Sequence, residues 1–211
     1  MIIETATQRD DDWFDARLGK ATASRFKDVM ATLKNGNPAQ AQQDYLTELV
    51  VERLTQQPVQ RFATAAMNWG TEQEAAARLA YERHADIEVQ ETGFVAHDTL
   101  MAGCSPDGLV YWDGLLEIKC PFNTGVHIET LLNGMPEHHT AQIQGQMWIT
   151  GRDWCDFVSY DPRMPVELQL HVQRIERDEA FIADLERRVS SFLSEVGKQV
   201  EALRVLAEKK Q

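Results

Sequence analysis

Two kinds of feature are scarce in this sequence. Three cysteines, Cys104, Cys120 and Cys155, occur among 211 residues, widely spaced and without a Cys-x-x-Cys pair. This pattern excludes a disulfide framework and a structural zinc site, so we expect three reduced, buried thiols. The longest apolar runs are interrupted by charge and fall far short of the roughly 20 residues of a membrane span. The first residues also lack a secretory leader. A soluble, intracellular protein is therefore expected.

Positive charge is also scarce. The chain carries 21 Lys and Arg against 33 Asp and Glu, a formal net charge of −12. Taken alone, this balance disfavours nucleic acid as a partner, because non-specific affinity for DNA comes mostly from cations that neutralise phosphates. The remaining composition is ordinary for a globular protein, with 43% hydrophobic and 26% charged residues. No repeat or linker divides the chain, so one domain over residues 1–211 is the simplest interpretation.

Hydrophobic spacing predicts the helices. Asp12 can cap a short helix over residues 13–18, and Thr22 can cap a second that starts near residue 23. The segment 34–38 has loop composition. Apolar residues at three- and four-residue intervals predict further helices over residues 45–54, 68–84, 123–132, 138–150 and 178–206. In the helix over 68–84, the expected buried residues are Ala76, Leu79 and Ala80.

Alternating hydrophobicity predicts strands between these helices. The expected strands cover residues 87–97, 101–104, 109–112, 115–120, 154–160 and 166–175. Asp113-Gly114 is a dipeptide typical of two-residue hairpin turns, so it is predicted to join the third and fourth of them. Helices followed by a meander of strands and then by further helices and strands indicate a mixed α/β fold.

Two carboxylates and a lysine are expected to converge on this hairpin. Asp107 follows Ser105-Pro106, and Glu117 and Lys119 share one face of a strand because alternate residues point the same way. Carboxylates of this kind suit Mg²⁺, and an adjacent lysine can orient or deprotonate an attacking water. Without further information the alternative remains open, since Glu-x-Lys is also a common exposed charge pair and Ser-Pro-Asp-Gly an ordinary turn.

The Asp-x9-Glu-x-Lys spacing resembles the motif of the PD-(D/E)XK nucleases. The surrounding sequence segments resemble those of the bacteriophage lambda exonuclease family, also called the YqaJ-like viral recombinases. The resemblance spans about residues 13–180 in the family's order. The matching segments are 17–19, 22–24, 69–70 with Glu74, 104–108, 117–122, 141–144, 147–150, 160–164 and 175–179.

The resemblance implies a restriction-endonuclease-like α/β core, a central mixed β-sheet flanked by helices on both sides. It implies a Mg²⁺-dependent enzyme, with two ions per site and Mn²⁺ as a substitute. Such an enzyme hydrolyses linear double-stranded DNA from its 5′ ends to mononucleotides and leaves 3′ single-stranded overhangs. It also implies a homotrimeric ring, a single-strand annealing protein as partner, and a phage or prophage origin in the cytosol of a bacterial host.

Residue roles follow from the same resemblance. Asp107, Glu117 and the main-chain carbonyl of Ile118 would hold the metal, and Glu74 would contribute to a second ion. Lys119 would position the nucleophilic water. Gln144 would hydrogen-bond near the site, in preference to Gln142. The pocket for the terminal 5′-phosphate would consist of Arg17, Ser24 and Ser105, a chemistry that suits phosphate because arginine binds it bidentately and hydroxyls add donors. Ser24, in the first turn of a helix, would add free N–H groups.

Some segments depart from the family pattern. The loop around Lys34 is shorter and less basic than expected, so DNA contacts of Lys34, and those of Arg25 and Gln142, have the weakest support. His127, His138 and His139 lack the spacing of a zinc site and are predicted to lie at the surface or in loops.

The resemblance changes the meaning of the acidic charge. Residues 1–40 carry six acids and six bases, whereas residues 41–160 carry 17 acids and six bases, a net charge of −11. We therefore expect an outer surface that repels DNA and a local basic lining that guides it inward. The N-terminal segment would supply this lining through Arg17, Arg25, Lys27 and Lys34. The alternatives are a non-catalytic DNA-end scaffold and a restriction-type endonuclease. A RecB-type nuclease with an iron–sulfur cluster is disfavoured, because its cluster needs four cysteines.

Overall fold

The computed structural model of the protein describes residues 2–3, 5, 7–59 and 62–210. Its larger sheet has the strand order β5-β6-β7-β8. The strands are β5 (Gly108–Val110), β6 (Gly114–Lys119), β7 (Trp154–Tyr160) and β8 (Leu170–Glu176). The central pair β6 and β7 is parallel and the two outer pairs are antiparallel, so the sheet is mixed, as predicted.

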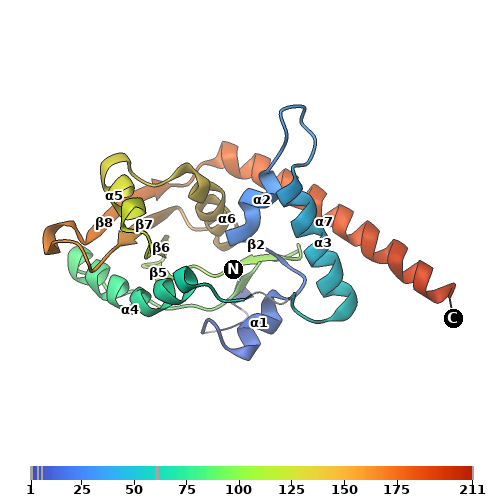
Figure 1. The fold of residues 1–211 in the computed structure, drawn as a ribbon, viewed down its shortest axis with the longest axis horizontal. Coiled ribbons are helices and arrows are strands. Elements are labelled where there is room, and N and C mark those ends of the chain that lie inside the picture. The colour runs from blue at the N-terminus through green and yellow to red at the C-terminus, as the bar shows by residue number, and fades with distance from the viewer. Residues whose placement is uncertain (1, 4, 6, 60–61, 211) are drawn as a thin grey trace.

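Helices cover both faces of this sheet, which confirms the expected architecture (Figure 1). Helix α4 (Ala65–Ala85) packs on one face, where Leu116 and Ile118 of β6 are buried. Helices α5 (Thr124–Asn133) and α6 (Thr140–Thr150) lie on the other. Because side chains alternate along a strand, Leu115 and Glu117 face α6. The Glu117 side chain therefore points from β6 toward α6, where it contacts Gln146.

The second sheet lies beside the first and has the order β1-β3-β4-β2. Its strands are β1 (Ile2–Ile3), β2 (Ala21–Thr22), β3 (Val95–Ala96) and β4 (Ala102–Cys104). Around it lie helices α1 (Asp11–Arg17), α2 (Phe26–Met30), α3 (Gln40–Thr55) and α7 (Glu179–Glu208). Three short 3₁₀ turns complete the described elements, at Ala23–Arg25 (η1), Glu137–His139 (η2) and Val166–Leu168 (η3).

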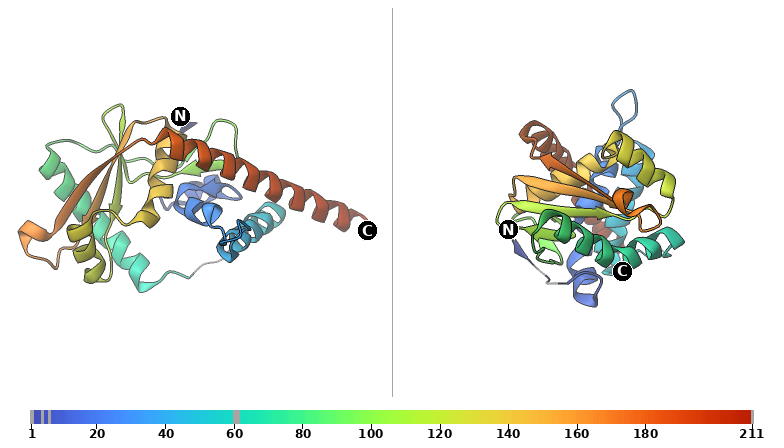
Figure 2. Two further views of the ribbon diagram at one scale, coloured as in Figure 1. Left: turned by 90° about the horizontal axis from the view of Figure 1, so that it is seen from above. Right: turned by 90° about the vertical axis from the view of Figure 1, so that its left-hand side faces the viewer.

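Helix α7 buries one face of about its first six turns against α2, α3 and α6. The buried residues on it are Ile182, Leu185, Val189, Phe192, Leu193, Val196 and Val200. The predicted helix over residues 178–206 is confirmed, and its buried face ends at Val200, since Leu203 is 44% exposed. The last turns project beyond the rest of the molecule (Figure 2). No helix among the described residues is long and apolar enough to cross a membrane.

The hairpin turn differs from the prediction. Val110 pairs with Gly114, so residues 111–113 form the connection and Tyr111 adopts a left-handed φ of 50°. Gly114 is the first residue of β6 and does not belong to the turn. A Cβ on Gly114 would come within 2.1 Å of the Trp154 ring, so glycine is needed there to admit the indole.

Three other elements were also predicted inaccurately. The expected strand over 87–97 contains only the bridge at Gln90 and the short β3. The first residues of the expected strand over 166–175 form the turn η3. In α4, Ala77 and Tyr81 are fully buried, whereas Ala76 is exposed and Leu79 is 46% exposed. Of the three predicted residues, only Ala80 packs against the core, and it is partly buried. The alanine-rich sequence of α4 has a weak amphipathic pattern, so the core-facing side was misassigned by one residue.

Candidate nuclease site

The β5–β6 hairpin brings together the acidic residues singled out by the sequence. Asp107, just before β5, donates its backbone N–H to Leu116 O at 3.0 Å, and its Oδ2 accepts the N–H of Ile118 at 2.6 Å. Asp107 is therefore fixed against the strand that carries Glu117 and Lys119. Asp107, Glu117, Ile118 and Lys119 all line one cavity of about 510 Å³.

Glu117 is only 2% exposed, and donors occupy both of its carboxylate oxygens. Lys119 Nζ and Gln142 Nε2 each lie 2.5 Å from Oε1, and Gln146 Nε2 lies 2.6 Å from Oε2. The charges of Glu117 and Asp107 outweigh the opposing effect of burial and raise the pKa of Lys119 above its ordinary value. Lys119 is therefore a charged hydrogen-bond donor in this structure.

The prediction for Gln144 is wrong. Its side chain points away from Glu117 and binds Glu176 O at 2.9 Å and Asp178 N at 2.9 Å. Residues four apart on a helix share a face, so Gln142 and Gln146 contact the carboxylate while Gln144 lies on another side of α6. Gln142 accepts from Lys119 Nζ at 3.3 Å as well. The less favoured residue of the predicted pair is thus the one at the site.

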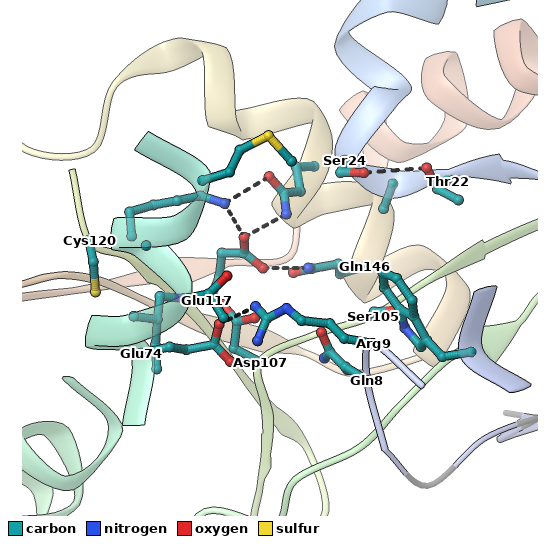
Figure 3. Close-up of a pocket in the computed structure, with 18 of the residues that line it drawn as sticks. Gln8, Arg9, Thr22, Ser24, Glu74, Ser105, Asp107, Glu117, Cys120 and Gln146 are labelled. Carbon is teal, nitrogen blue, oxygen red and sulfur yellow. Dashed lines mark hydrogen bonds and ion pairs between the residues drawn. The ribbon is translucent and has the colours of Figure 1, made fainter. Parts of the chain in front are cut away.

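Glu74 reaches the same cavity from α4. Its Oε2 pairs with Arg9 Nη2 at 2.5 Å, and its Oε1 lies 3.4 Å from Arg78 Nη2. Figure 3 shows Glu74, Asp107 and Glu117 gathered on one side of the pocket with Arg9 reaching toward Glu74. Arg9 was not found by sequence reasoning, because nothing local indicates that it faces a helix 65 residues away.

The donor chemistry of this cluster fits a divalent cation. Burial, followed by the charge of Glu117 and the weaker influence of Glu74, raises the pKa of Asp107 well above its usual range. Mg²⁺ would relieve this crowding, and it needs only one or two carboxylates because it keeps several waters. As the side chains stand, no three His, Cys, Asp or Glu in the described part of the chain could hold a metal. Glu74 and Glu117 would have to exchange their present partners.

The other side of the cavity carries the predicted phosphate residues. Ser105 Oγ accepts from Trp13 Nε1 at 2.9 Å and from Arg17 Nη1 at 3.3 Å. These bonds use both of its acceptor positions, so its O–H remains a donor for a ligand in the cavity. The Arg17 guanidinium stacks on the Trp13 ring at 4.1 Å. Trp13, missed by the sequence analysis, thus orients two predicted residues.

Ser24 also lines the cavity, but its setting differs from the expectation. It lies in the 3₁₀ turn η1 and not in the first turn of an α-helix, and its Oγ is 3.3 Å from Thr22 Oγ1. Ser24 therefore offers a hydroxyl, without the row of helix N–H groups that was predicted.

Three cations and three carboxylates line the cavity, so the lining is not uniformly negative. They are Arg9, Arg17, Lys119, Glu74, Asp107 and Glu117. Arg25 and Lys34 do not line it. The Arg25 side chain pairs with Asp28 and Glu48 and stacks on Tyr45 at 4.1 Å. Of the N-terminal cations expected to form a basic lining, Arg17 lines this cavity and Arg25 does not.

The histidine prediction is wrong at His127. This residue is fully buried between Ser159, 2.7 Å from Nδ1, and Leu168 O, 2.8 Å from Nε2. A carbonyl only accepts, so Nε2 donates and Nδ1 accepts from the serine hydroxyl. His127 is a core residue that joins α5 to β7. His138 and His139 lie in η2, where His138 is exposed and His139 half-buried. The three cysteines are free and buried, as predicted.

Arg163 connects helix α4 to the segment that follows Lys119. It stacks on Trp69 of α4 at 4.4 Å and donates to the carbonyls of Pro121 and Phe122, which follow Lys119. Buried Asp161 accepts three bonds from Arg163, two of them from its guanidinium at 2.8 Å. Burial acts to raise the pKa of Asp161, but these bonds outweigh it and lower the pKa from 3.8 to about 2.

Replacing Asp161 by asparagine is expected to lower the free energy of unfolding by about 2 kcal/mol at neutral pH. Since the folded pKa is depressed, the stabilisation is complete above the usual pKa of 3.8 and is lost as pH falls toward about 2. Urea denaturation from pH 7 to pH 2 would measure both effects. Exposed Asp153→Asn is the matched control. Equal stability of the two variants at pH 7 would contradict the prediction.

Comparison with known proteins decides the family. The model of the YqaJ-like viral recombinase domain matches residues 12–153. The chain belongs to this family. An alkaline exonuclease, LHK-Exo from Laribacter hongkongensis, is 46% identical with a TM-score of 0.89, over 96% of this chain and 100% of that one. Its complex with dAMP matches at 47% identity, with the same TM-score and coverage.

Two further matches are more distant or cover less of the chain. A phage-related exonuclease from Haemophilus somnus 129PT shares the fold, with a TM-score of 0.72 and 16% sequence identity. The match covers 87% of this chain and 96% of that chain. The Escherichia coli (strain K12) protein ExoD is 40% identical over 58 residues, which cover 28% of this chain and 66% of that protein. The family match and the likeness to LHK-Exo confirm the predicted family and fold class.

Proposed function

We propose that this protein is a Mg²⁺-dependent nuclease that removes nucleotides from the 5′ ends of linear double-stranded DNA and leaves 3′ single-stranded overhangs. One observation carries the proposal. The cluster Asp107, Glu117 and Lys119 shares a cavity with Arg17 and Ser105, so groups suited to hydrolysis lie beside groups suited to a terminal phosphate. The family and the likeness to an alkaline exonuclease, solved also with dAMP, support it.

In this proposal Asp107, Glu117 and the carbonyl of Ile118 would hold one Mg²⁺, and Glu74 would contribute to a second. The bound ions would activate water and neutralise charge that develops on the phosphate. Lys119 donates a hydrogen bond to the attacking water. Its charge is held in place by Glu117 and Gln142.

Arg17, Ser105 and Ser24 bind the 5′-phosphate of the terminal nucleotide. Water attacks the next phosphorus, and the bond from that phosphorus to the 3′ oxygen of the first nucleotide breaks. The released nucleotide gains the 3′ hydroxyl proton, and the shortened strand keeps a new 5′-phosphate. Each cleavage therefore regenerates the group that the cavity recognises, which favours repeated action from one end.

The remaining parts of the proposal rest on the family resemblance. They are Mn²⁺ as a substitute ion, a homotrimeric ring, a single-strand annealing protein as partner, and a phage or prophage protein that acts in the cytosol of a bacterial host. A ring around its product strand would keep the enzyme attached with modest affinity at each contact.

The proposal predicts a selective pattern of degradation. Mononucleotides should appear from linear duplex with 5′-phosphate ends, much more slowly from 5′-hydroxyl ends, and not from closed circles. EDTA should stop the reaction and added Mg²⁺ restore it, because the carboxylates act through the ion. Product analysis by chromatography would test each arm. Cleavage of circles would indicate an endonuclease, and intact DNA in every arm would favour a non-catalytic end-binding scaffold.

A further inference from the structure

Arg9 is a cation that lines the cavity but has no role in the proposed reaction. Its guanidinium lies against Glu74 Oε2 at 2.5 Å, in the place where the proposed second cation would need that oxygen. The Arg9 side chain is 44% exposed, whereas the Glu74 side chain is 15% exposed. The arginine thus reaches inward to a carboxylate at the edge of the cavity.

The backbone around Arg9 is fixed on both sides. Gln8 Nε2 donates to Thr92 O at 3.1 Å and to Pro106 O at 2.8 Å, next to Asp107. On the other side, Asp10 accepts from Thr7 Oγ1 and caps α1 by accepting from Trp13 N at 2.8 Å. These bonds hold residues 7–10 across the carboxylate end of the cavity, so Arg9 remains there when its ion pair breaks.

The conformation of Arg9 itself is unfavourable. Its φ is 70°, in the left-handed region that a residue with a Cβ adopts at a cost. Such conformations persist where surrounding contacts impose them, and they gather at functional sites. Here the imposed conformation directs a cation toward Glu74.

A guanidinium and a divalent cation cannot occupy the same carboxylate oxygen, and their like charges repel at short range. Arg78 is less committed to Glu74, since it lies 3.4 Å away and pairs with Glu91 at 2.6 Å. We propose that Arg9 is a resident competitor for the divalent cation, which holds Glu74 in the metal-free protein and weakens cation binding. This inference rests on the proposed role of Glu74 as a metal ligand.

The test measures binding of Mn²⁺ alone, without DNA, by calorimetry. Arg9→Ala removes the charge and keeps a Cβ, and Arg9→Gly also removes the backbone cost. Both should lower the Kd for Mn²⁺ roughly 5- to 50-fold, the range expected for such coupling. Arg83→Ala, an exposed cation on the same helix as Glu74, should leave the Kd within about twofold. The gain from Arg9→Ala should disappear in a Glu74→Gln background.

The outcomes separate this inference from the proposed function. An unchanged Kd in Arg9→Ala would overturn the competitor role, and so would a gain confined to Arg9→Gly, which would assign the effect to the backbone. If the native protein still binds Mn²⁺ and Asp107→Asn abolishes that binding, the proposed metal site stands regardless. Binding seen in Arg9→Ala but not in the native protein would support the inference. No binding in any variant would overturn both. Circular dichroism would confirm that each variant is folded.

Discussion

Replacing Lys119 by alanine is expected to slow the release of mononucleotides from 5′-phosphorylated duplex DNA by roughly 10³-fold, the scale of a lost catalytic donor or base. The ammonium of Lys119 lies at the cavity between Glu117 and Gln142, and nearby carboxylates raise its pKa. No other lysine lines the described cavity. The variant keeps both glutamine bonds to Glu117, so the carboxylate remains partly satisfied.

Single-turnover assays at saturating DNA would isolate the hydrolytic step from end binding. Lys198→Ala, which removes an exposed lysine of α7, is the control and should retain the native rate. Removing one member of a buried pair can destabilise a protein, so Lys119→Gln, which keeps hydrogen-bond donors without the charge, provides a second test. Native rates in both Lys119 variants would exclude the lysine from the chemistry.

The central hairpin could be predicted from sequence because its signal is local. Asp107, Glu117 and Lys119 are connected by strand alternation and a short turn, and the structure brings them together as expected. The turn itself was misread, because Asp-Gly is a strong turn signal and the packing of Gly114 under Trp154 depends on a strand 40 residues later. Predictions from local sequence were therefore reliable where no side chain from a distant segment determined the backbone conformation.

Helix faces were harder to predict. In α6, eight of eleven residues are buried, so polarity did not show which glutamine faces the sheet. The spacing of Gln142 and Gln146 was an available signal, since residues four apart on a helix share a face. His127 was likewise placed outside the core because its partners, Ser159 and Leu168, lie in later elements.

Charge was the least predictable property. Arg25 and Arg17 are equivalent in a count of basic residues, but Arg25 is engaged by two carboxylates and only Arg17 of the two lines the cavity. Arg9, whose partner lies on α4, had no local signal at all. Ion pairs between distant segments decide which cations face a ligand, so the net charge of −12 could not exclude DNA.

The difference between Arg17 and Arg25 leads to a selective prediction. Arg17→Ala should slow hydrolysis of 5′-phosphorylated duplex roughly 30- to 100-fold, as expected for loss of hydrogen bonds to a charged group. Hydrolysis of 5′-hydroxyl duplex should change little, because that end offers no terminal phosphate to Arg17. The preference for phosphorylated ends should therefore fall with the rate.

The ratio of the two rates is the decisive measurement, because it does not depend on the fraction of folded enzyme. Arg25→Ala breaks ion pairs with Asp28 and Glu48 and should cost stability, but it should leave the ratio unchanged. Trp13→Phe removes the indole donor to Ser105 and should lower the ratio less than Arg17→Ala does, because it keeps an aromatic ring under the guanidinium. A native ratio in Arg17→Ala would place recognition of the 5′-phosphate elsewhere, and a reduced ratio in Arg25→Ala would restore that residue to the DNA-binding surface.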